Sequence, residues 1–221
     1  MADREHKEAL YAHVARAGKA LAHGKRLELL DLLAQAERSV EALAVATGLS
    51  VTSTSAHLQV LRRGGLVQTR RDGNRVHYRL AGDDVARLLV SLRELAADRL
   101  ADVERAAREY LGEDDVEPVS REELQRRLRQ GDVVVVDVRP AEEYAAGHVR
   151  GAVSIPVDEL ERRIGELPPG AEVVAYCRGP LCVYAPQAVG ILRRHGVPAR
   201  RLEGGFPEWR LERRPVRRLA S

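Results

Sequence analysis

Residues 176–186 read YCRGPLCVYAP and hold both cysteines of the chain, Cys177 and Cys182. The short apolar run EVVA at 172–175 comes just before this stretch and is typical of a buried strand. The run QAVGILRR at 187–194 follows it with helical spacing, and Pro186 suits a first helical turn, where a missing amide costs little. The stretch is therefore predicted to be a loop that joins a strand end to a helix start.

Such a loop favours negative charge, because its backbone amides turn inward and the helix adds unpaired N–H groups and its positive end. A thiolate at Cys177 would be stabilised there, so we expect its pKa to fall below the ordinary value of about 8.5. Cys177 is thus predicted to be the thiol that first gains sulfur. Cys182 is either a spectator or a resolving thiol that attacks a persulfide on Cys177 and expels sulfide as a disulfide forms.

The segments around this loop alternate between helix and strand. Helices are predicted at 121–129, 141–146, 157–164 and up to His195, and strands at 133–137, 152–155, 172–176 and 200–202. Alternation of this kind predicts an α/β domain with a mainly parallel sheet that is covered by helices. Ligands of such sheets bind at the carboxyl ends of strands, which is where Cys177 falls.

Four further motifs keep a common order and spacing with the cysteine loop: DVRPAEEY at 137–144, GHVRGA at 147–152, IP at 155–156 and EGGFPEW at 203–209. With them, residues 118–215 resemble the rhodanese (sulfurtransferase) family. The resemblance implies that Cys177 is the catalytic cysteine and that Arg139 and Glu143 form a pair that holds the fold. The family usually carries an arginine five positions after the cysteine, where this chain has Cys182, which weakens the expected activity. Arg178 is expected to replace that cation in part.

The first half of the chain reads as a helix-turn-helix. Scaffold helices are predicted at 8–22 and 25–34, a short helix at 39–46, and, after a turn at 47–49, a second helix with Ser50 as its N-cap. In this second helix the residues expected to face the core are Thr54, Leu58, Leu61 and Gly65. The residues expected to point outward, towards base edges, are Val51, Thr52, Ser53, Ser55, Ala56 and Gln59.

A basic hairpin follows this helix. Two strands at 66–71 and 75–80 are joined through Asp72-Gly73-Asn74, a strong tight-turn signal, and a hairpin in this place predicts a wing. Six arginines here face only Asp72: Arg62, Arg63, Arg70, Arg71, Arg75 and Arg79. Such a patch is either a solvated surface or a site for phosphate backbones, and the position of Arg70, Arg71 and Arg75 near the wing tip favours DNA.

The run LQVLRRGGLV at 58–67, with the hairpin that ends in HYRL at 77–80, resembles the arsenic-repressor (ArsR) family of winged-helix regulators over residues 8–95. The resemblance implies a double-stranded operator DNA as partner and a homodimer formed through the terminal helices. A single long helix is predicted at 83–111, with an apolar stripe that either meets a partner helix or packs on its own domain. The members of this stripe are Val85, Leu88, Leu92, Leu95, Ala96, Leu100, Val103, Ala107 and Tyr110.

Length and composition agree with two domains. The chain has 221 residues, and an acidic stretch at 112–117 predicts a linker between a first domain at 1–111 and a second at 118–215. The first 111 residues hold 18 Lys and Arg against 15 Asp and Glu, so the whole net charge of +3 lies there. No apolar run approaches the roughly 20 residues of a membrane span, and the N-terminus does not resemble a secretory signal. We therefore expect no membrane association and a cytoplasmic, reducing location, in which two cysteines act as reactive thiols.

No metal site or cofactor is expected, because residues 35–46 lack cysteine and residues 83–111 lack both cysteine and histidine. The fold class is therefore predicted to be an α+β winged helix-turn-helix domain followed by an α/β rhodanese-like domain. We expect a DNA-binding repressor that senses sulfane sulfur or redox state through Cys177 and Cys182, with a small sulfur donor such as polysulfide or thiosulfate. The alternative is a sulfurtransferase that carries a Cys177 persulfide and is tethered or autoregulated by the DNA-binding domain. An arsenite sensor is a third possibility.

Overall fold

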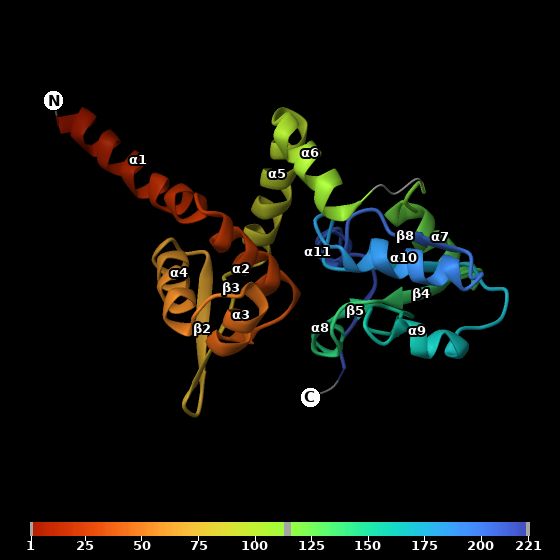
Figure 1. Ribbon diagram of the computed structural model, residues 1–221. Coiled ribbons are helices and arrows are strands. Elements are labelled where there is room, and N and C mark those ends of the chain that lie inside the picture. Colours follow the sequence, from red (N-terminus) through yellow and green to blue (C-terminus); the bar gives the residue numbers. More distant parts are fainter. Residues whose placement is uncertain (1, 113–115, 220–221) are drawn as a thin grey trace. The chain divides into compact units, whose positions relative to one another are not determined.

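The computed structural model describes residues 2–112 and 116–219, and Figure 1 shows its helices and strands. The chain divides into two compact units, residues 1–91 and 92–221. Residues 113–115 of the predicted linker lie outside the described part, and the domain bounds 1–111 and 118–215 stay a prediction. None of the helices that are described combines the length and the apolar character needed to cross a membrane.

The first unit begins with the helices α1 (Ala2–Leu21), α2 (Gly24–Gln35), α3 (Val40–Thr47) and α4 (Val51–Arg63). Ser39 and Ser50 cap α3 and α4, since each side-chain oxygen accepts an amide of the following first turn, and Gly48 ends α3 in the left-handed region at φ 67°. These caps confirm the predicted helix-turn-helix. The first helix starts earlier than predicted, at Ala2.

The inner face of α4 carries Thr54, Leu58 and Leu61, which are all fully buried as predicted. The prediction that Gly65 faces the core is wrong: it is exposed and lies beyond the end of α4 at φ 77°. Gly64 makes the close contact in its place, because an added Cβ there would lie 2.6 Å from the Cβ of Ala20. The missing side chain of Gly64 therefore lets the end of α4 pack against α1.

The wing is confirmed as an antiparallel hairpin of β2 (Val67–Asp72) and β3 (Arg75–Leu80), with Asp72 opposite Arg75. A short strand that the sequence did not predict, β1 (Arg38–Ser39), pairs with β3, so the sheet order is β1-β3-β2. The third strand ties the base of the wing to the start of α3, while the tip of the hairpin extends beyond it (Figure 1).

The predicted helix 83–111 is two helices, α5 (Asp83–Arg99) and α6 (Ala101–Leu111). Leu100 is extended, with φ −119° and ψ 99°, and its carbonyl accepts the amide of Val103 at 2.9 Å to begin the new helix. Residues 83–111 contain neither glycine nor proline. Because these are the residues that usually interrupt a helix, the break at Leu100 could not be predicted from the sequence.

The second unit contains a parallel sheet in the order β6-β4-β7-β8, formed by β4 (Val134–Asp137), β6 (Val153–Ser154), β7 (Val173–Tyr176) and β8 (Ala199–Arg201). This confirms the predicted α/β architecture. The helices are α7 (Arg121–Gln130), α8 (Ala141–Ala146), α9 (Leu160–Arg163), the 3-10 turn η1 (Ile164–Glu166), α10 (Tyr184–Arg194) and α11 (Phe206–Leu211). The prediction missed α11 and a small antiparallel pair, β5 (His148–Val149) with β9 (Val216–Arg217).

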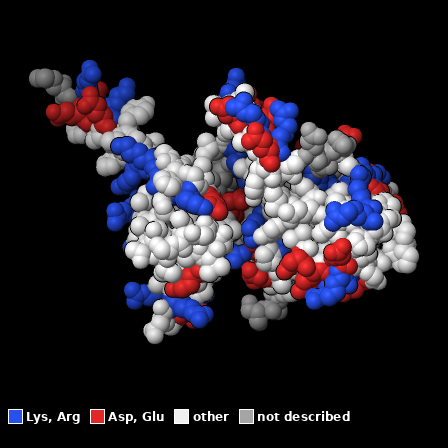
Figure 2. All heavy atoms as spheres, in the orientation of Figure 1, with Lys and Arg blue, Asp and Glu red and all other residues white. Residues whose placement is uncertain are grey.

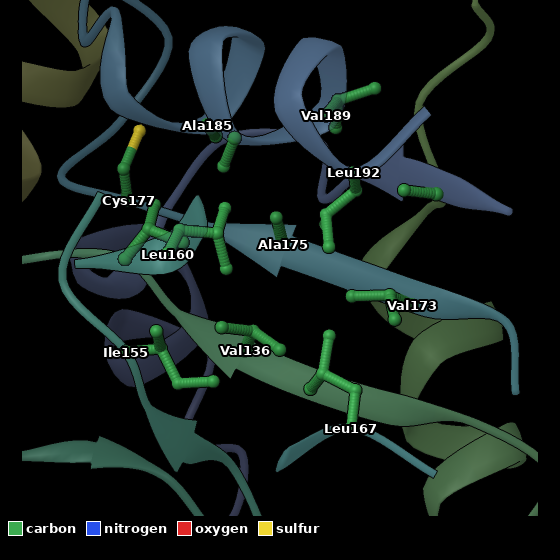
Figure 3. Packing of buried hydrophobic residues seen from close by; sticks show 13 residues of the cluster. Val136, Ile155, Leu160, Leu167, Val173, Ala175, Cys177, Ala185, Val189 and Leu192 are labelled. Carbon is green, nitrogen blue, oxygen red and sulfur yellow. The ribbon is translucent and has the colours of Figure 1, made fainter. Parts of the chain in front are cut away.

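Two apolar cores lie on opposite faces of this sheet, because successive strand residues point to opposite sides. Val136 and Ala175 pack with Leu192 of α10 in the core that Figure 3 shows. The alternate residues Val135 and Val174 belong to the other core, which includes Leu124 of α7 and Trp209 of α11. Each such fully buried large apolar side chain contributes about 1.5–3 kcal/mol of transfer free energy. Cys177 belongs to the first core and lies at its edge.

Candidate functional site

The cysteine loop leaves the carboxyl end of β7 and enters α10. Cys177 follows the last strand residue directly, and its carbonyl accepts the amide of Phe206 at 3.0 Å. A Cβ added to Gly205 would lie 2.4 Å from the amide nitrogen of Gly179, which itself has φ 151°. A side chain at position 205 would prevent this approach, so Gly205 of the EGGFPEW motif lets its backbone pack directly against the cysteine loop.

Both thiols lie in this one loop and are reduced. The Sγ of Cys177 is 3.5 Å from the carbonyl oxygen of Cys182 and 3.7 Å from that of Gly179, and the amide of Cys182 donates to Gly179 at 3.1 Å. In Figure 3 the Cys177 side chain points from the end of β7 towards the turn of α10 that carries Ala185. Cys177 is 2% exposed, whereas Cys182 is half-buried, and both line the same cavity. The loop thus holds one thiol inside and the other nearer its surface.

The two thiols have opposite tendencies to ionise. Burial raises the pKa of Cys177 well above its ordinary value, and the neighbouring Cys182 raises it further. The pKa of Cys182 is lowered to about 7, first because the Cys177 thiol donates a hydrogen bond to it, and then through backbone amides of Tyr184 and Arg178 and the charge of Arg178. These directions favour a thiolate at Cys182 over one at Cys177. This is the opposite of the lowered pKa that the sequence predicted for Cys177, and desolvation is the reason.

Arg178 does not extend freely into the loop. Its guanidinium binds the fully buried carboxylate of Glu143 and lies over the ring of Tyr184, with its carbon Cζ 5.2 Å from the ring centroid. Arg178 was predicted to replace the family's loop arginine in part. The structure places it on the α8 side of the loop as one half of an ion pair, with its charge still close enough to act on Cys182.

A second buried ion pair lies beneath the loop. Asp137 at the end of β4 accepts two bonds from the Arg139 side chain, at 2.9 and 2.6 Å, and both residues are fully buried. The hydroxyl of Tyr176 also donates to Asp137 and accepts the amide of Val149. The sequence was expected to pair Arg139 with Glu143. The structure shows the ion pairs Asp137–Arg139 and Glu143–Arg178, and the negative charge of Glu143 also raises the pKa of Arg139. No role was predicted for Tyr176.

On α4, the second helix of the helix-turn-helix, Thr52 and Ser53 are exposed and Ser55 is half-buried. Gln59 is half-buried too, and its amide donates to the hydroxyl of Tyr78 on β3 at 3.1 Å. This bond fixes the side chain that was predicted to reach bases. No local pattern in the sequence predicts this bond, because the two residues lie 19 positions apart and only the hairpin brings them together.

The predicted basic residues Arg62, Arg63, Arg71 and Arg75 are exposed, the last two near the hairpin tip, where Figure 2 shows Lys and Arg side chains. Arg70 is also exposed but binds Glu37 at 2.7 Å and Asp72 at 3.4 Å. The expectation that Asp72 is the only acidic neighbour of this patch is therefore wrong. Glu37 precedes β1, and its approach to the hairpin depends on the unpredicted β1–β3 pairing.

The apolar stripe of the predicted long helix divides between two surroundings. Val85 of the stripe is buried inside the first unit, and so is Leu89 of α5, which was not predicted to belong to the stripe. Large apolar residues that remain exposed lie on α5, on α6 and between them, and further ones on α1: Leu88, Leu95, Leu100, Tyr110, Leu10, Tyr11 and Val14. An isolated exposed leucine needs no explanation, but this many on a few helices favour a partner surface.

Two family models match the chain. Residues 23–69 match the bacterial regulatory protein arsR family, and residues 120–212 match the rhodanese-like domain. The HTH-type transcriptional regulator Rv0324 of Mycobacterium tuberculosis is 53% identical over 212 residues, covering 96% of this chain and 93% of that protein. The biofilm growth-associated repressor of Agrobacterium fabrum is 45% identical over 34% of this chain and 63% of its own length.

Among solved structures, the NMR structure of a homodimeric winged helix-turn-helix DNA-binding domain from Mycobacterium bovis, described as a possible ArsR-family transcriptional regulator, is 56% identical. It covers 43% of this chain and 89% of that domain, with a TM-score of 0.41.

Proposed function

We propose a function for this chain, which belongs to the family of HTH-type transcriptional regulators and joins an arsR-type helix-turn-helix region to a rhodanese-like domain. The protein binds an operator duplex, and its rhodanese-like domain senses sulfane sulfur through Cys177 and Cys182. Modification of these thiols changes the affinity for the operator. Operator DNA is found in the cytoplasm, so that is the compartment in which this function would operate.

The capped recognition helix and the basic wing support DNA binding. Thr52 and Ser53 are exposed near the start of α4, where small hydrogen-bonding side chains can approach base edges. Arg71 and Arg75 are exposed near the end of the hairpin, and arginines placed there can contact the sugar-phosphate backbone beside the groove. Thr52 and Ser53 thus contact base edges, whereas Arg71 and Arg75 contact phosphates.

The observation that carries the sensing function is the contact between the two thiols. The Cys177 sulfur lies against the backbone of Cys182, 3.5 Å from its carbonyl oxygen, so a sulfur atom added to either thiol has the other close by in the same loop. A persulfide next to a thiol can be converted into a disulfide, and this change outlasts the encounter with the donor. A lasting change of state is what a regulator requires.

A dimer supports the same function, because operators are commonly read as two half-sites by paired recognition helices. Leu95 and Leu100 are more than half exposed, at 57% and 55%, and burying such side chains against a second copy would be favourable by roughly 25 cal/mol per Å² of apolar surface. We therefore propose that a homodimer forms through α5 and α6, with α1 as a further contributor.

A second candidate function is sulfurtransfer, and the position of Cys177 at the carboxyl end of a parallel strand favours it. The two functions differ in their need for Cys182. Turnover that moves sulfur from thiosulfate to cyanide would proceed through one thiol, whereas the proposed switch uses both. Fast turnover that survives Cys182→Ser would support the enzyme over the sensor.

The proposed function is tested with the full-length protein and a duplex from its own promoter region. Fluorescence anisotropy measures DNA binding before and after treatment with sodium tetrasulfide, and intact mass records added sulfur or loss of thiol hydrogens in the same samples. We expect the wild type to change both in mass and in affinity. The double variant Cys177→Ser/Cys182→Ser should bind the duplex and ignore tetrasulfide. A wild type that is modified with no change in affinity would disprove sensing.

A further inference from the structure

We infer that helix α6 completes the cavity on which the two thiols open, and that this cavity takes sulfur from an organic persulfide that carries an acidic group. The inference rests on the proposed function, because it names the donor that the proposed sensor meets. Helix α6 precedes residues 120–212, which match the rhodanese-like domain. One wall of the thiol site therefore comes from outside that domain.

One side of α6 lines the cavity. The cavity-lining residues of this helix are Glu104, Ala107, Arg108 and Leu111, and the same cavity is lined by Cys177 and Cys182. Positions 104, 107, 108 and 111 follow the spacing i, i+3, i+4, i+7, which places their side chains on one side of a helix. Tyr110 lies on another side of α6, where it is 64% exposed and stays available for the proposed dimer.

An ion pair holds the second half of α5 beside the same loop. Nη2 of Arg93 donates to Oε1 of Glu208 on α11 at 3.0 Å, and the two side chains are 20% and 9% exposed. A Cβ added to Gly179, which lines the cavity, would lie 3.4 Å from Nη1 of Arg93 and 3.7 Å from Oε1 of Glu208. Arg93 and α6 belong to the same compact unit as the cysteine loop. The helix pair thus contacts the thiol site at two places.

The size and the apolar walls of the cavity suit an organic molecule. Its volume is about 470 Å³, within the range of roughly 300–1,000 Å³ that is typical of sites for small organic ligands. Apolar side chains come from both parts of its lining: Ala107 and Leu111 from α6, and Pro180, Pro186 and Leu202 from the rhodanese-like domain. Burying a carbon group against these walls is favourable. An inorganic polysulfide ion has no such group to bury.

The charged residues of the lining favour an acidic donor. Arg108 and Arg201 line the cavity together with the single carboxylate of Glu104, so the positive charges exceed the negative one. Glu104 accepts from Arg108 at 3.2 Å. A guanidinium has five N–H donors, so Arg108 can hold Glu104 and also donate to a carboxylate of the ligand. The donor class is therefore a persulfide whose organic part carries a carboxylate.

The transfer step requires room for the whole donor. A cysteine thiolate attacks the outer sulfur of R–S–SH, the S–S bond of the donor breaks, and its electron pair leaves with R–S⁻. The cysteine keeps the transferred sulfur and its hydrogen as Cys–S–SH. The organic part R is therefore next to the attacked sulfur when the bond breaks, and in this protein that place is the cavity beside α6.

The wall formed by α6 is tested by filling the cavity in the full-length protein. Ala107→Trp places a large ring on the cavity side of α6, and Ala106→Trp, at the exposed neighbouring position, is the matched control. Intact mass follows thiol alkylation by iodoacetamide and by the bulky N-(1-pyrenyl)iodoacetamide. Ala107→Trp should slow the bulky reagent at least about fivefold and the small one less than about twofold, because the ring occupies space that only the larger molecule needs. Unchanged or faster reaction of Ala107→Trp with the bulky reagent would overturn the wall.

The preference for an acidic group is tested with iodoacetate and iodoacetamide, which differ in charge at nearly equal size. Arg108→Gln should lower the ratio of the iodoacetate rate to the iodoacetamide rate by about two- to fivefold, the effect expected of one partly exposed charge. Arg105→Gln removes a charge from another side of α6 and should leave the ratio close to that of the wild type. Equal ratios in wild type and Arg108→Gln would overturn the acidic donor.

The donor itself is tested with N-acetylcysteine persulfide against sodium tetrasulfide. Ala107→Trp should slow sulfur uptake from the organic donor more than uptake from the inorganic one, and equal slowing would overturn the donor class. Circular dichroism checks that the variants are folded, and operator binding is measured in the same samples. If uptake depends on residue 107 as expected but operator affinity never changes, the sensing function fails and the site stands. A change of operator affinity with uptake that is independent of residue 107 does the opposite.

Discussion

The guanidinium of Arg178 donates hydrogen bonds to both carboxylate oxygens of Glu143, with Nη2 to Oε1 at 2.6 Å and Nε to Oε1 and Oε2 at 2.9 and 3.1 Å. The carboxylate is fully buried and the guanidinium side chain is 17% exposed. One member of the pair lies on α8 and the other directly follows Cys177, so this pair anchors the start of the cysteine loop to a neighbouring helix.

Removing Glu143 should therefore destabilise the second unit. Glu143→Ala leaves a largely buried guanidinium without its carboxylate, and losing one partner of a buried ion pair typically costs about 3–5 kcal/mol. Urea denaturation followed by circular dichroism measures the free energy of unfolding. The exposed Asp158 of the same unit supplies the control, since Asp158→Ala should stay within about 0.5 kcal/mol of wild type. Equal losses in the two variants would contradict an anchoring role for Glu143.

The features that were predicted correctly depend on interactions between residues close together in the sequence. The Ser50 cap, the Asp72-Gly73-Asn74 turn and the apolar strands each act over a few residues, and the structure has them where the sequence placed them. The assignments that failed depend on contacts between distant segments. Glu37 reaches Arg70 only through the two-residue strand β1, which is too short to leave a pattern in the sequence.

The thiol site shows the same limit. The sequence located both cysteines in one strand-to-helix loop, and the spacing alone suggested that the strand-end thiol would ionise more readily. Ionisation depends on how deep each sulfur lies, and this is decided by Phe206, Gly205 and the other segments that close over the loop. Gly205 and Phe206 belong to the EGGFPEW motif, but the spacing of that motif did not predict how they pack against Cys177.

The wing arginines should differ in their contribution to DNA binding. Arg71→Ala and Arg75→Ala should each weaken binding to all duplexes and reduce the slope of log K against log salt by about 1, because each removes one phosphate contact. Arg70→Ala is a matched control on the same hairpin, since Arg70 is already paired with Glu37 and Asp72. Its effect on the slope should be smaller. Fluorescence anisotropy titrations at several salt concentrations measure the slope for each variant. Three equal slopes would contradict the predicted difference between Arg70 and the other two arginines.

Recognition-helix changes should act on sequence preference. Ser53→Ala removes an exposed hydroxyl and should cost roughly 1–3 kcal/mol at one operator position while leaving random duplexes unaffected. Tyr78→Phe leaves Gln59 in place but removes the hydroxyl that holds its amide. It should broaden the preference at the position that Gln59 reads. Binding to a panel of single-base operator variants measures both effects, and uniform weakening across the panel would argue against base contacts.

The exposed leucines of α5 should control the oligomeric state. Leu95→Glu places a charge in the proposed partner surface and should yield monomers that bind the operator poorly. Leu219→Glu, at a residue of similar exposure near the C-terminus, should remain a dimer. Sedimentation velocity at operator-binding concentrations measures the assembly. A monomeric wild type at those concentrations would remove the dimer from the proposed function.

The reactivity of Cys182 should follow pH with a midpoint near its lowered pKa of about 7. The thiolate is the reactive form, so the rate of alkylation by iodoacetamide should fall about tenfold per pH unit below that midpoint and level off above it. The hydrogen bond from the inner thiol is the largest cause of the low value, so removing the donor should raise the midpoint towards the ordinary value of about 8.5. Cys177→Ala removes that donor, whereas Cys177→Ser keeps a hydroxyl in the same place. We therefore expect the alanine variant to react with a midpoint well above 7 and the serine variant to stay near the wild type. Peptide mass spectrometry of timed samples gives the rate at Cys182 in each protein, and identical midpoints in the two variants would show that the inner thiol does not set the ionisation of the outer one.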